Sequence, residues 1–304
     1  MHPGYVHLRY ICVHLRFQSL SPAMSTMREG AVRCLDPHGF HWVRYVEWGD
    51  AKNPRVLVCV HGLTRNARDF DYVAEHLADA YRVVSVDVVG RGRSDWLRDP
   101  VDYNYPVYCG DMATLIASLH AETVDWLGTS MGGIIGMIMA SLPGTPVRKL
   151  VMNDVGALIP RASLVRIGEY VGREVPYDSI DALEAAMRAV SPFGNLSAAQ
   201  WRHLALHVAK QDDHGKWRFR YDPGIGRNFH AAPPADIDLR PYWQAVHGPV
   251  LVIRGEHSDL LTRATLDEML KHPHTQSYVV ADTGHAPMLM DDAQAGVIRR
   301  FLLG

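Results

Sequence analysis

A serine flanked by glycines gives the clearest chemical signal in the sequence, within the run GTSMG at 128–132. This run follows an apolar stretch at 123–127, which predicts a strand, and it opens a helical pattern at 131–142. A nucleophile on such a tight strand-to-helix turn needs small neighbours, and the glycines two positions before and after it leave that space. The N–H groups at a helix start also stabilise a developing oxyanion. The pattern predicts that Ser130 is a nucleophile for carbonyl chemistry.

A hydroxyl group needs a base to take its proton, and His285 has the best position among the 17 histidines. It lies within TGHAP at 283–287, after the last predicted strand (277–281) and before the last predicted helix (293–303). A loop at this place can bring the imidazole over the strand ends to Ser130. We therefore predict that His285 is the catalytic base.

Three carboxylates are candidates for the group that orients the imidazole. Asp259 follows the predicted strand 250–254 and is the preferred candidate. Asp154, at the end of the predicted strand 149–154, is the main alternative. Glu256 is a weaker alternative. With Asp259, the predicted triad follows the chain order nucleophile, acid, base.

The backbone N–H groups of Leu63 and Met131 are predicted to form an oxyanion hole. Leu63 follows His61 and Gly62, directly after the predicted strand 55–60. Glycine at this place lets the backbone approach a substrate closely, and His61 is interpreted as a residue that shapes the loop. Two such donors would stabilise the tetrahedral intermediate of acyl transfer.

Glycines and arginines follow the predicted strand 82–87, in the run DVVGRGRS at 87–94. The spacing fits neither the GxxxxGK[ST] nor the GxGxxG phosphate-binding pattern. We interpret the run as a tight structural loop in which Arg91 and Arg93 are solvated or paired with nearby acids.

The sequence does not predict a metal ion or another cofactor. His203 and His207 are four positions apart, as two metal ligands on one helix would be, but no acidic third ligand has a recognisable spacing. We interpret the pair as part of a helix face. The four cysteines are widely spaced and form no CxxC pair.

An alternation of short apolar strands with helical patterns must position these residues. The predicted strands are almost continuously apolar, as strands buried on both faces are. Such an alternation predicts a mostly parallel sheet covered by helices. The stretch 31–48 is expected to form a hairpin that joins the sheet at its start.

This alternation stops after residue 154 and resumes at residue 249. The segment 156–240 contains amphipathic helical patterns at 161–171, 179–190 and 197–210, followed by a return rich in proline and glycine. We interpret it as a helical cap over the carboxyl ends of the strands, where open α/β sheets place their sites. The segments 27–155 and 241–304 would then form the core.

Composition excludes several classes of protein. The chain has 304 residues, 47% of them hydrophobic and 21% charged, and a formal net charge of −2, which argues against disorder and against a general nucleic-acid binder. No apolar run approaches the roughly 18 residues that a membrane helix needs. We expect a cytoplasmic protein without nucleic-acid or membrane partners. The segment 1–26 is expected to be a poorly ordered extension without a role in the mechanism.

Together, the runs HGLT, DVVGRGRS, GTSMGG and TGHAP and the Asp259 loop resemble the α/β-hydrolase superfamily, in particular its lid-bearing bacterial serine esterases and lactonase-like members. The resemblance extends from about residue 31 to residue 304. It implies an eight-stranded sheet, a helical cap between the sixth and seventh strands, and no cofactor. Ser130 separates the chain from haloalkane dehalogenases and epoxide hydrolases, which have aspartate at this position.

The sequence therefore predicts a serine hydrolase that cleaves carboxylic esters through an acyl-enzyme. Tyr170 and Trp217 of the cap, together with Met288 after the histidine, are expected to line an apolar pocket for small to medium acyl groups. A C–C bond hydrolase or an enol-lactonase with the same triad is an alternative, and a ligand receptor of this fold with little turnover is a second one. The expected partners are a small-molecule ester and water, and the sequence does not predict the oligomeric state.

Overall fold

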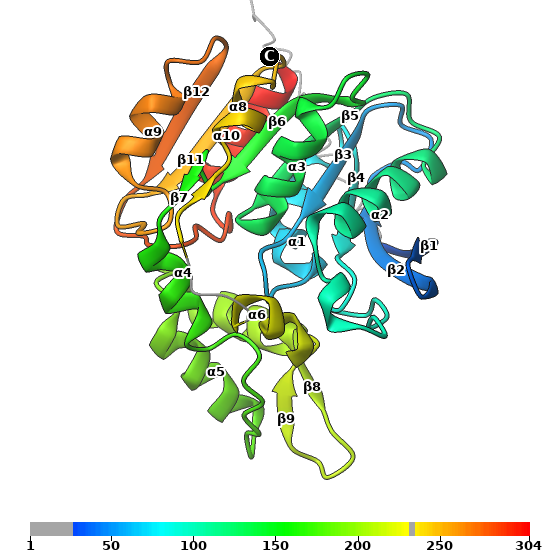
Figure 1. The fold of residues 1–304 in the computed structure, drawn as a ribbon, viewed down its shortest axis with the longest axis vertical. Coiled ribbons are helices and arrows are strands. Elements are labelled where there is room, and N and C mark those ends of the chain that lie inside the picture. The colour runs from blue at the N-terminus through cyan, green and yellow to red at the C-terminus, as the bar shows by residue number, and fades with distance from the viewer. Residues whose placement is uncertain (1–26, 231–234) are drawn as a thin grey trace, which may run out of the picture.

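The computed structural model describes residues 27–230 and 235–304, so the predicted N-terminal extension lies outside the described residues. An eight-stranded sheet with the order β1-β2-β4-β3-β5-β6-β11-β12 forms the centre of the molecule (Figure 1). β2 pairs antiparallel with β1 and β4, and the other neighbours are parallel. The strands are β1 Arg28–Asp36, β2 Gly39–Trp48, β3 Val56–Val60, β4 Arg82–Asp87, β5 Val124–Thr129, β6 Val147–Asn153, β11 Val250–Gly255 and β12 Thr275–Val280. The predicted eight-stranded, mostly parallel sheet is confirmed.

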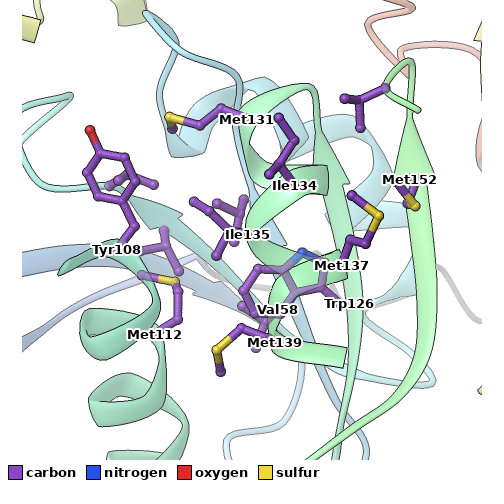
Figure 2. Packing of buried hydrophobic residues seen from close by; sticks show 14 of the residues in the cluster. Val58, Tyr108, Met112, Trp126, Met131, Ile134, Ile135, Met137, Met139 and Met152 are labelled. Carbon is purple, nitrogen blue, oxygen red and sulfur yellow. The ribbon is translucent and has the colours of Figure 1, made fainter. Parts of the chain in front are cut away.

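Helices cover both faces of the sheet, because the central strands are apolar on both faces; all five residues of β3, for example, are buried. One apolar cluster includes side chains of α1 and α10, and another includes side chains of α2, α3, α8 and α9. Figure 2 shows Ile135 of α3, Trp126 of β5 and Met112 of α2 within the second cluster. The helices are α1 Asp71–Leu77, α2 Tyr105–Ser118, α3 Met131–Ser141, α8 Arg240–Gln244, α9 Arg263–Met269 and α10 Asp292–Leu303.

The cap leaves the sheet after β6, its sixth strand, and returns before β11, as predicted; it is the lower part of Figure 1. Its elements are β7 Leu158–Ile159, α4 Arg161–Gly168, α5 Ile180–Val190, α6 Ala198–Val208, β8 Ala209–Gln211, β9 Trp217–Phe219, α7 Arg227–His230 and β10 Ile237–Asp238. β7 pairs with β10 where the chain enters and leaves the cap. β8 and β9 form a hairpin that the sequence reading did not predict.

Local sequence explains where the cap helices start. Ser179 accepts a hydrogen bond from the N–H of Ala182 at the start of α5, and Ser197 forms a capping box with Gln200 at the start of α6. The cap also has an apolar cluster of its own, which extends to Met288 of the core. Within the described residues, no helix is sufficiently long and apolar to cross a membrane.

Candidate active site

Ser130 lies on the turn between β5 and α3, with a backbone φ of 52° and ψ of −115°. Residues other than glycine rarely adopt a positive φ, and such backbone strain is typical of functional turns. The flanking glycines make the turn possible. A Cβ atom on Gly132 would overlap the carbonyl group of Val60, and one on Gly128 would overlap the backbone of Gly132. The two glycines therefore permit a close approach of three backbone segments around Ser130.

His285 bridges Ser130 and Asp154. Its Nε2 atom is 3.0 Å from Ser130 Oγ, and its Nδ1 atom is 2.8 Å from Asp154 Oδ2. Because an ionised carboxylate only accepts hydrogen bonds, Nδ1–H donates to Asp154 and the Nε2 lone pair accepts from the serine hydroxyl. The imidazole is thus placed to take the proton of Ser130. The structure brings the predicted pair Ser130 and His285 together.

Asp154 is completely buried and fixed by the core. It follows directly after β6, and its backbone N–H donates to the carbonyl group of Ile253 in β11 over 2.8 Å. Its Oδ1 atom accepts the N–H of Gly255 over 2.9 Å, which leaves Oδ2 for the imidazole. Each carboxylate oxygen therefore has a single, defined donor.

The expectation for Asp259 is wrong, because the structure turns this side chain away from the imidazole. Asp259 forms a forked ion pair with Arg166 of α4, with distances of 2.7 and 2.9 Å, on the outside of the molecule. The loop that carries Asp259 folds around Arg254, whose guanidinium donates to three backbone carbonyl groups of this loop. The other alternative, Glu256, is exposed and accepts the N–H of Asp282.

Asn153 supports the loop of His285, and the sequence reading missed it. Its Nδ2 atom donates to the carbonyl group of Pro287 over 2.8 Å and to Thr129 Oγ1 over 3.0 Å. It thereby links the turn of Ser130 to the loop of His285. The only sequence signal is a polar residue that ends an apolar strand.

The two predicted oxyanion donors lie next to the serine. Met131 is the first residue of α3, and Leu63 belongs to the same cavity wall as Ser130. A Cβ atom on Gly62 would lie 3.5 Å from the Cβ atom of Ser130, so this loop approaches the serine closely. Within the described part of the chain, neither the N–H of Leu63 nor that of Met131 donates a hydrogen bond. Both donors are therefore available to a ligand.

His61 shapes this loop, as expected. Its Nε2 atom accepts the N–H of Val88 over 3.0 Å, so its Nδ1–H donates to the carbonyl group of Gly62 over 2.7 Å. Burial lowers the pKa of His61 to about 3, which keeps the ring neutral.

Arg91 corrects the interpretation of the loop 87–94. Its side chain is completely buried and therefore not solvated, and it pairs with no acid among the described residues. Its Nε–H donates to the carbonyl group of Leu63 over 2.9 Å, one Nη donates to Tyr108 over 3.0 Å, and the other contacts the sulfur of Met131 at 3.5 Å. Arg91 thus contacts both candidate oxyanion residues from behind the cavity wall. Arg93 does pair with an acid, Glu29.

A cavity of about 370 Å³ opens over Ser130, between the core and the cap. Tyr170 and Met288 line it, as predicted. Trp217 does not. It lies in β9, where it pairs with Tyr177 and packs on the cluster of the cap. The volume lies at the lower end of the range for small-molecule sites.

Three clusters within the described residues contain potential metal ligands, and one of them, Glu256 with His257 and Asp282, is exposed at the surface. The structure brings Asp71 to His203 and His207, which supplies the acidic group that the sequence spacing did not show. However, the guanidinium of Arg68 already binds the carboxylate of Asp71 over 2.6 Å.

The second cluster consists of Cys34, His41 and Asp111. Here both nitrogens of His41 already have hydrogen bonds, to Asp36 and to Asp111. Protein partners thus already engage the carboxylate of Asp71 in the first of these clusters and both ring nitrogens of His41 in the other.

Comparison with known proteins agrees with this geometry. The family model for the alpha/beta hydrolase fold matches residues 55–292. The 3-hydroxybutyrate-oligomer hydrolase of Cupriavidus necator is 46% identical over 287 residues, which cover 91% of this chain and 98% of that protein. Esterase YbfF of Escherichia coli is 26% identical over 82% of this chain and 94% of its own length.

A solved structure is also similar. An alpha/beta hydrolase from Novosphingobium aromaticivorans has a TM-score of 0.82 and 31% identity, with 92% of this chain and 99% of that chain covered. The chain therefore belongs to the α/β-hydrolase superfamily, as an esterase-like hydrolase.

Proposed function

We propose that this hydrolase cleaves carboxylic esters through an acyl-enzyme formed on Ser130. The observation that supports the proposal most directly is the position of His285, with one ring nitrogen on the serine hydroxyl and the other on the buried Asp154. An ordinary surface serine has no such base, and its hydroxyl is a poor nucleophile.

In the proposed reaction, Ser130 Oγ attacks the ester carbonyl carbon while its proton moves to His285 Nε2. Asp154 stabilises the imidazolium, and the N–H groups of Leu63 and Met131 hold the oxyanion. The intermediate collapses as the ester C–O bond breaks, and His285 gives its proton to the leaving alcohol. Water, deprotonated by the same imidazole, then attacks the acyl carbon and releases the acid and the free serine.

The proposed substrates are short oligomers of hydroxy acids, and 3-hydroxybutyrate oligomers are the first choice. The name of the 46% identical relative supports this class. So does the cavity, because its wall is mainly apolar and aromatic, with Tyr177, Met187 and Phe193 from the cap. Such a wall suits an aliphatic chain with few polar atoms.

The test compares Ser130→Ala with Ser141→Ala, a control at the end of α3 whose hydroxyl donates to the carbonyl group of Ile138. The assays are the release of p-nitrophenol from p-nitrophenyl butyrate and the release of monomer from the 3-hydroxybutyrate dimer. We expect the wild type and Ser141→Ala to turn over many equivalents, and Ser130→Ala to lose at least about 10³-fold in kcat. Release of one equivalent by the wild type, followed by a stall, would indicate a receptor instead of an enzyme.

A further inference from the structure

The cavity over Ser130 has an excess of positive charge. Three arginines contribute to its wall, Arg65, Arg166 and Arg173, against one carboxylate, that of Asp69. A cleft with an excess of one charge attracts ligands of the opposite charge. The position and the partners of each arginine decide which of them is available to a ligand.

Arg65 and Arg166 are already paired. Arg65 forms a forked ion pair with Asp69 at 2.6 and 2.8 Å, and both side chains are mostly buried. Arg166 forms the fork with Asp259 described above. Since forked arginine–carboxylate pairs use the guanidinium edge that a substrate carboxylate would need, these two arginines are poor candidates for substrate binding.

Arg173 is different, because its guanidinium has no hydrogen bond or ion pair within the described residues. It lies in the turn after α4, where only its backbone N–H is engaged, with the carbonyl group of Tyr170 at 3.2 Å. Arg173 also contributes to the wall of a neighbouring cavity of about 430 Å³. It is therefore an exposed, unpaired cation at the place where the catalytic cavity meets the next one.

We propose that Arg173 binds a free carboxylate of the substrate, so that the enzyme prefers esters with an anionic end over neutral esters of the same shape. This inference rests on the proposed function and adds a substrate feature to it. The aromatic and aliphatic wall near Ser130 holds the chain of the ester, and Arg173 of the cap binds its acid terminus. An oligomer of a hydroxy acid has this form, with an apolar chain, internal esters and one terminal carboxylate.

In a dimer, this carboxylate belongs to the leaving group. When the ester C–O bond of the tetrahedral intermediate breaks and the acyl-serine forms, the released hydroxy acid takes its hydroxyl proton from His285 and keeps its carboxylate on Arg173. The charge of the carboxylate does not change in the reaction, so the contact is equally strong in the ground state and in the transition state. Such uniform binding lowers KM and leaves kcat unchanged.

The experiment uses the 3-hydroxybutyrate dimer and the same dimer with its terminal carboxylate converted to a primary amide. We expect the wild type to have a KM for the acid at least about fivefold below that for the amide, with similar kcat. Arg173→Gln should raise the KM for the acid by about five- to tenfold and change the KM for the amide less than twofold. Arg173→Lys keeps the charge and should retain most of the preference, and added salt should weaken it.

Arg263→Gln is the matched control, because Arg263 lies on α9 outside the catalytic cavity and the variant makes the same change in net charge. It should leave both KM values unchanged. Equal effects of Arg173→Gln on the acid and the amide, or an equal effect of Arg263→Gln, would overturn the inference and leave the proposed function intact.

Binding measured without turnover separates the two proposals. Calorimetry compares the dimer acid on Ser130→Ala and on Ser130→Ala/Arg173→Gln. Weaker binding of the acid to the double variant supports the carboxylate site even if the wild type hydrolyses neither dimer, a result that would contradict the proposed function alone. Equal binding to both variants refutes the carboxylate site.

Discussion

Replacement of Asp154 by asparagine should invert the tautomer of His285. The N–H of Gly255 is a fixed backbone donor 2.9 Å from one carboxylate oxygen of Asp154. Asparagine must keep its amide oxygen towards this donor, so its NH₂ group turns to the imidazole. Nδ1 then has to accept, and the ring proton moves to Nε2. An Nε2–H group donates to Ser130 and cannot take the serine proton.

The expected loss is large and specific to catalysis. The corresponding Asp→Asn change in a serine triad costs about 10⁴-fold in kcat, which is about 5 kcal/mol of transition-state stabilisation. We expect a loss of 10³- to 10⁴-fold in Asp154→Asn, with a KM within a few fold of the wild type. Asp259→Asn removes only the ion pair with Arg166. In this pair the side chain of Asp259 is 47% exposed and that of Arg166 is 38% exposed. Such exposed pairs contribute about 0–1 kcal/mol, so its kcat should stay within twofold.

Steady-state hydrolysis of p-nitrophenyl butyrate by both variants measures this difference, and circular dichroism checks that each is folded. The pair is matched in chemistry, since each variant exchanges one carboxylate for an amide. If Asp154→Asn keeps more than a tenth of the wild-type kcat, or if Asp259→Asn loses more than 100-fold, the assignment of the acid is refuted.

Three further outcomes follow from the structure. Gly132→Ala forces a Cβ atom into the backbone of β3 and should destabilise the protein by about 3 kcal/mol or more. Gly110 is exposed in α2 with open space around it, so Gly110→Ala should be neutral or stabilise the protein by about 0.4–1 kcal/mol. Urea unfolding measures the free energy of unfolding of both variants. Arg91→Met leaves the carbonyl group of Leu63 without its donor and should lower kcat about 10- to 100-fold with little change in KM, and an unchanged kcat would contradict the contact. Burial lowers the pKa of His41, but its two aspartate partners outweigh burial, so the pKa is raised. The protonated ring therefore stabilises the fold fully below about pH 6.5. This contribution to stability is lost as the pH rises through the raised pKa. The melting-temperature gap between the wild type and His41→Gln should therefore narrow from pH 5.5 to pH 9, and a constant gap would show that the charge on His41 does not matter.

Local patterns were sufficient to predict the elements of the core. The strand predicted at 82–87 is observed as Arg82–Asp87, and the helix predicted at 131–142 as Met131–Ser141. Both signals are local, since continuous apolar runs indicate buried strands and a glycine-flanked serine indicates a strand-to-helix turn. For the same reason, Ser130 and His285 could be placed on two loops that meet in the structure.

The carboxylate that contacts His285 could not be chosen from sequence, because Asp154 and Asp259 both follow strands that are neighbours in the sheet, β6 and β11. The distance from the strand end decides between them. Asp154 comes directly after β6 and stays at the sheet edge, whereas Asp259 lies four residues beyond the end of β11. Those four residues let the loop fold around Arg254 and carry Asp259 to the cap.

The burial of Arg91 and the placement of Trp217 depend on tertiary structure in a similar way. A charged residue in a glycine-rich loop is usually solvated, and only the packing of this loop against Leu63 and Tyr108 shows that Arg91 is buried. Trp217 was expected in the pocket because it is aromatic and belongs to the cap. Its strand pairs with β8 instead, a hairpin whose three-residue strands are too short for a periodic signal.

The proposed reacting groups and the cap are separate parts of the molecule, and substrate specificity can therefore vary without a change in the reacting groups. Ser130, Asp154 and His285 all lie on loops of the core, and Asp154 is fixed by the backbone of β11. The cap contributes side chains to the cavity wall and none of the three proposed reacting groups. Changes in the cap that preserve its fold should therefore alter which ester binds, and the steps on the acyl carbon should continue unchanged. A carboxylate site on the cap is consistent with this division, because it can select anionic substrates without disturbing the hydrogen bonds between Asp154, His285 and Ser130.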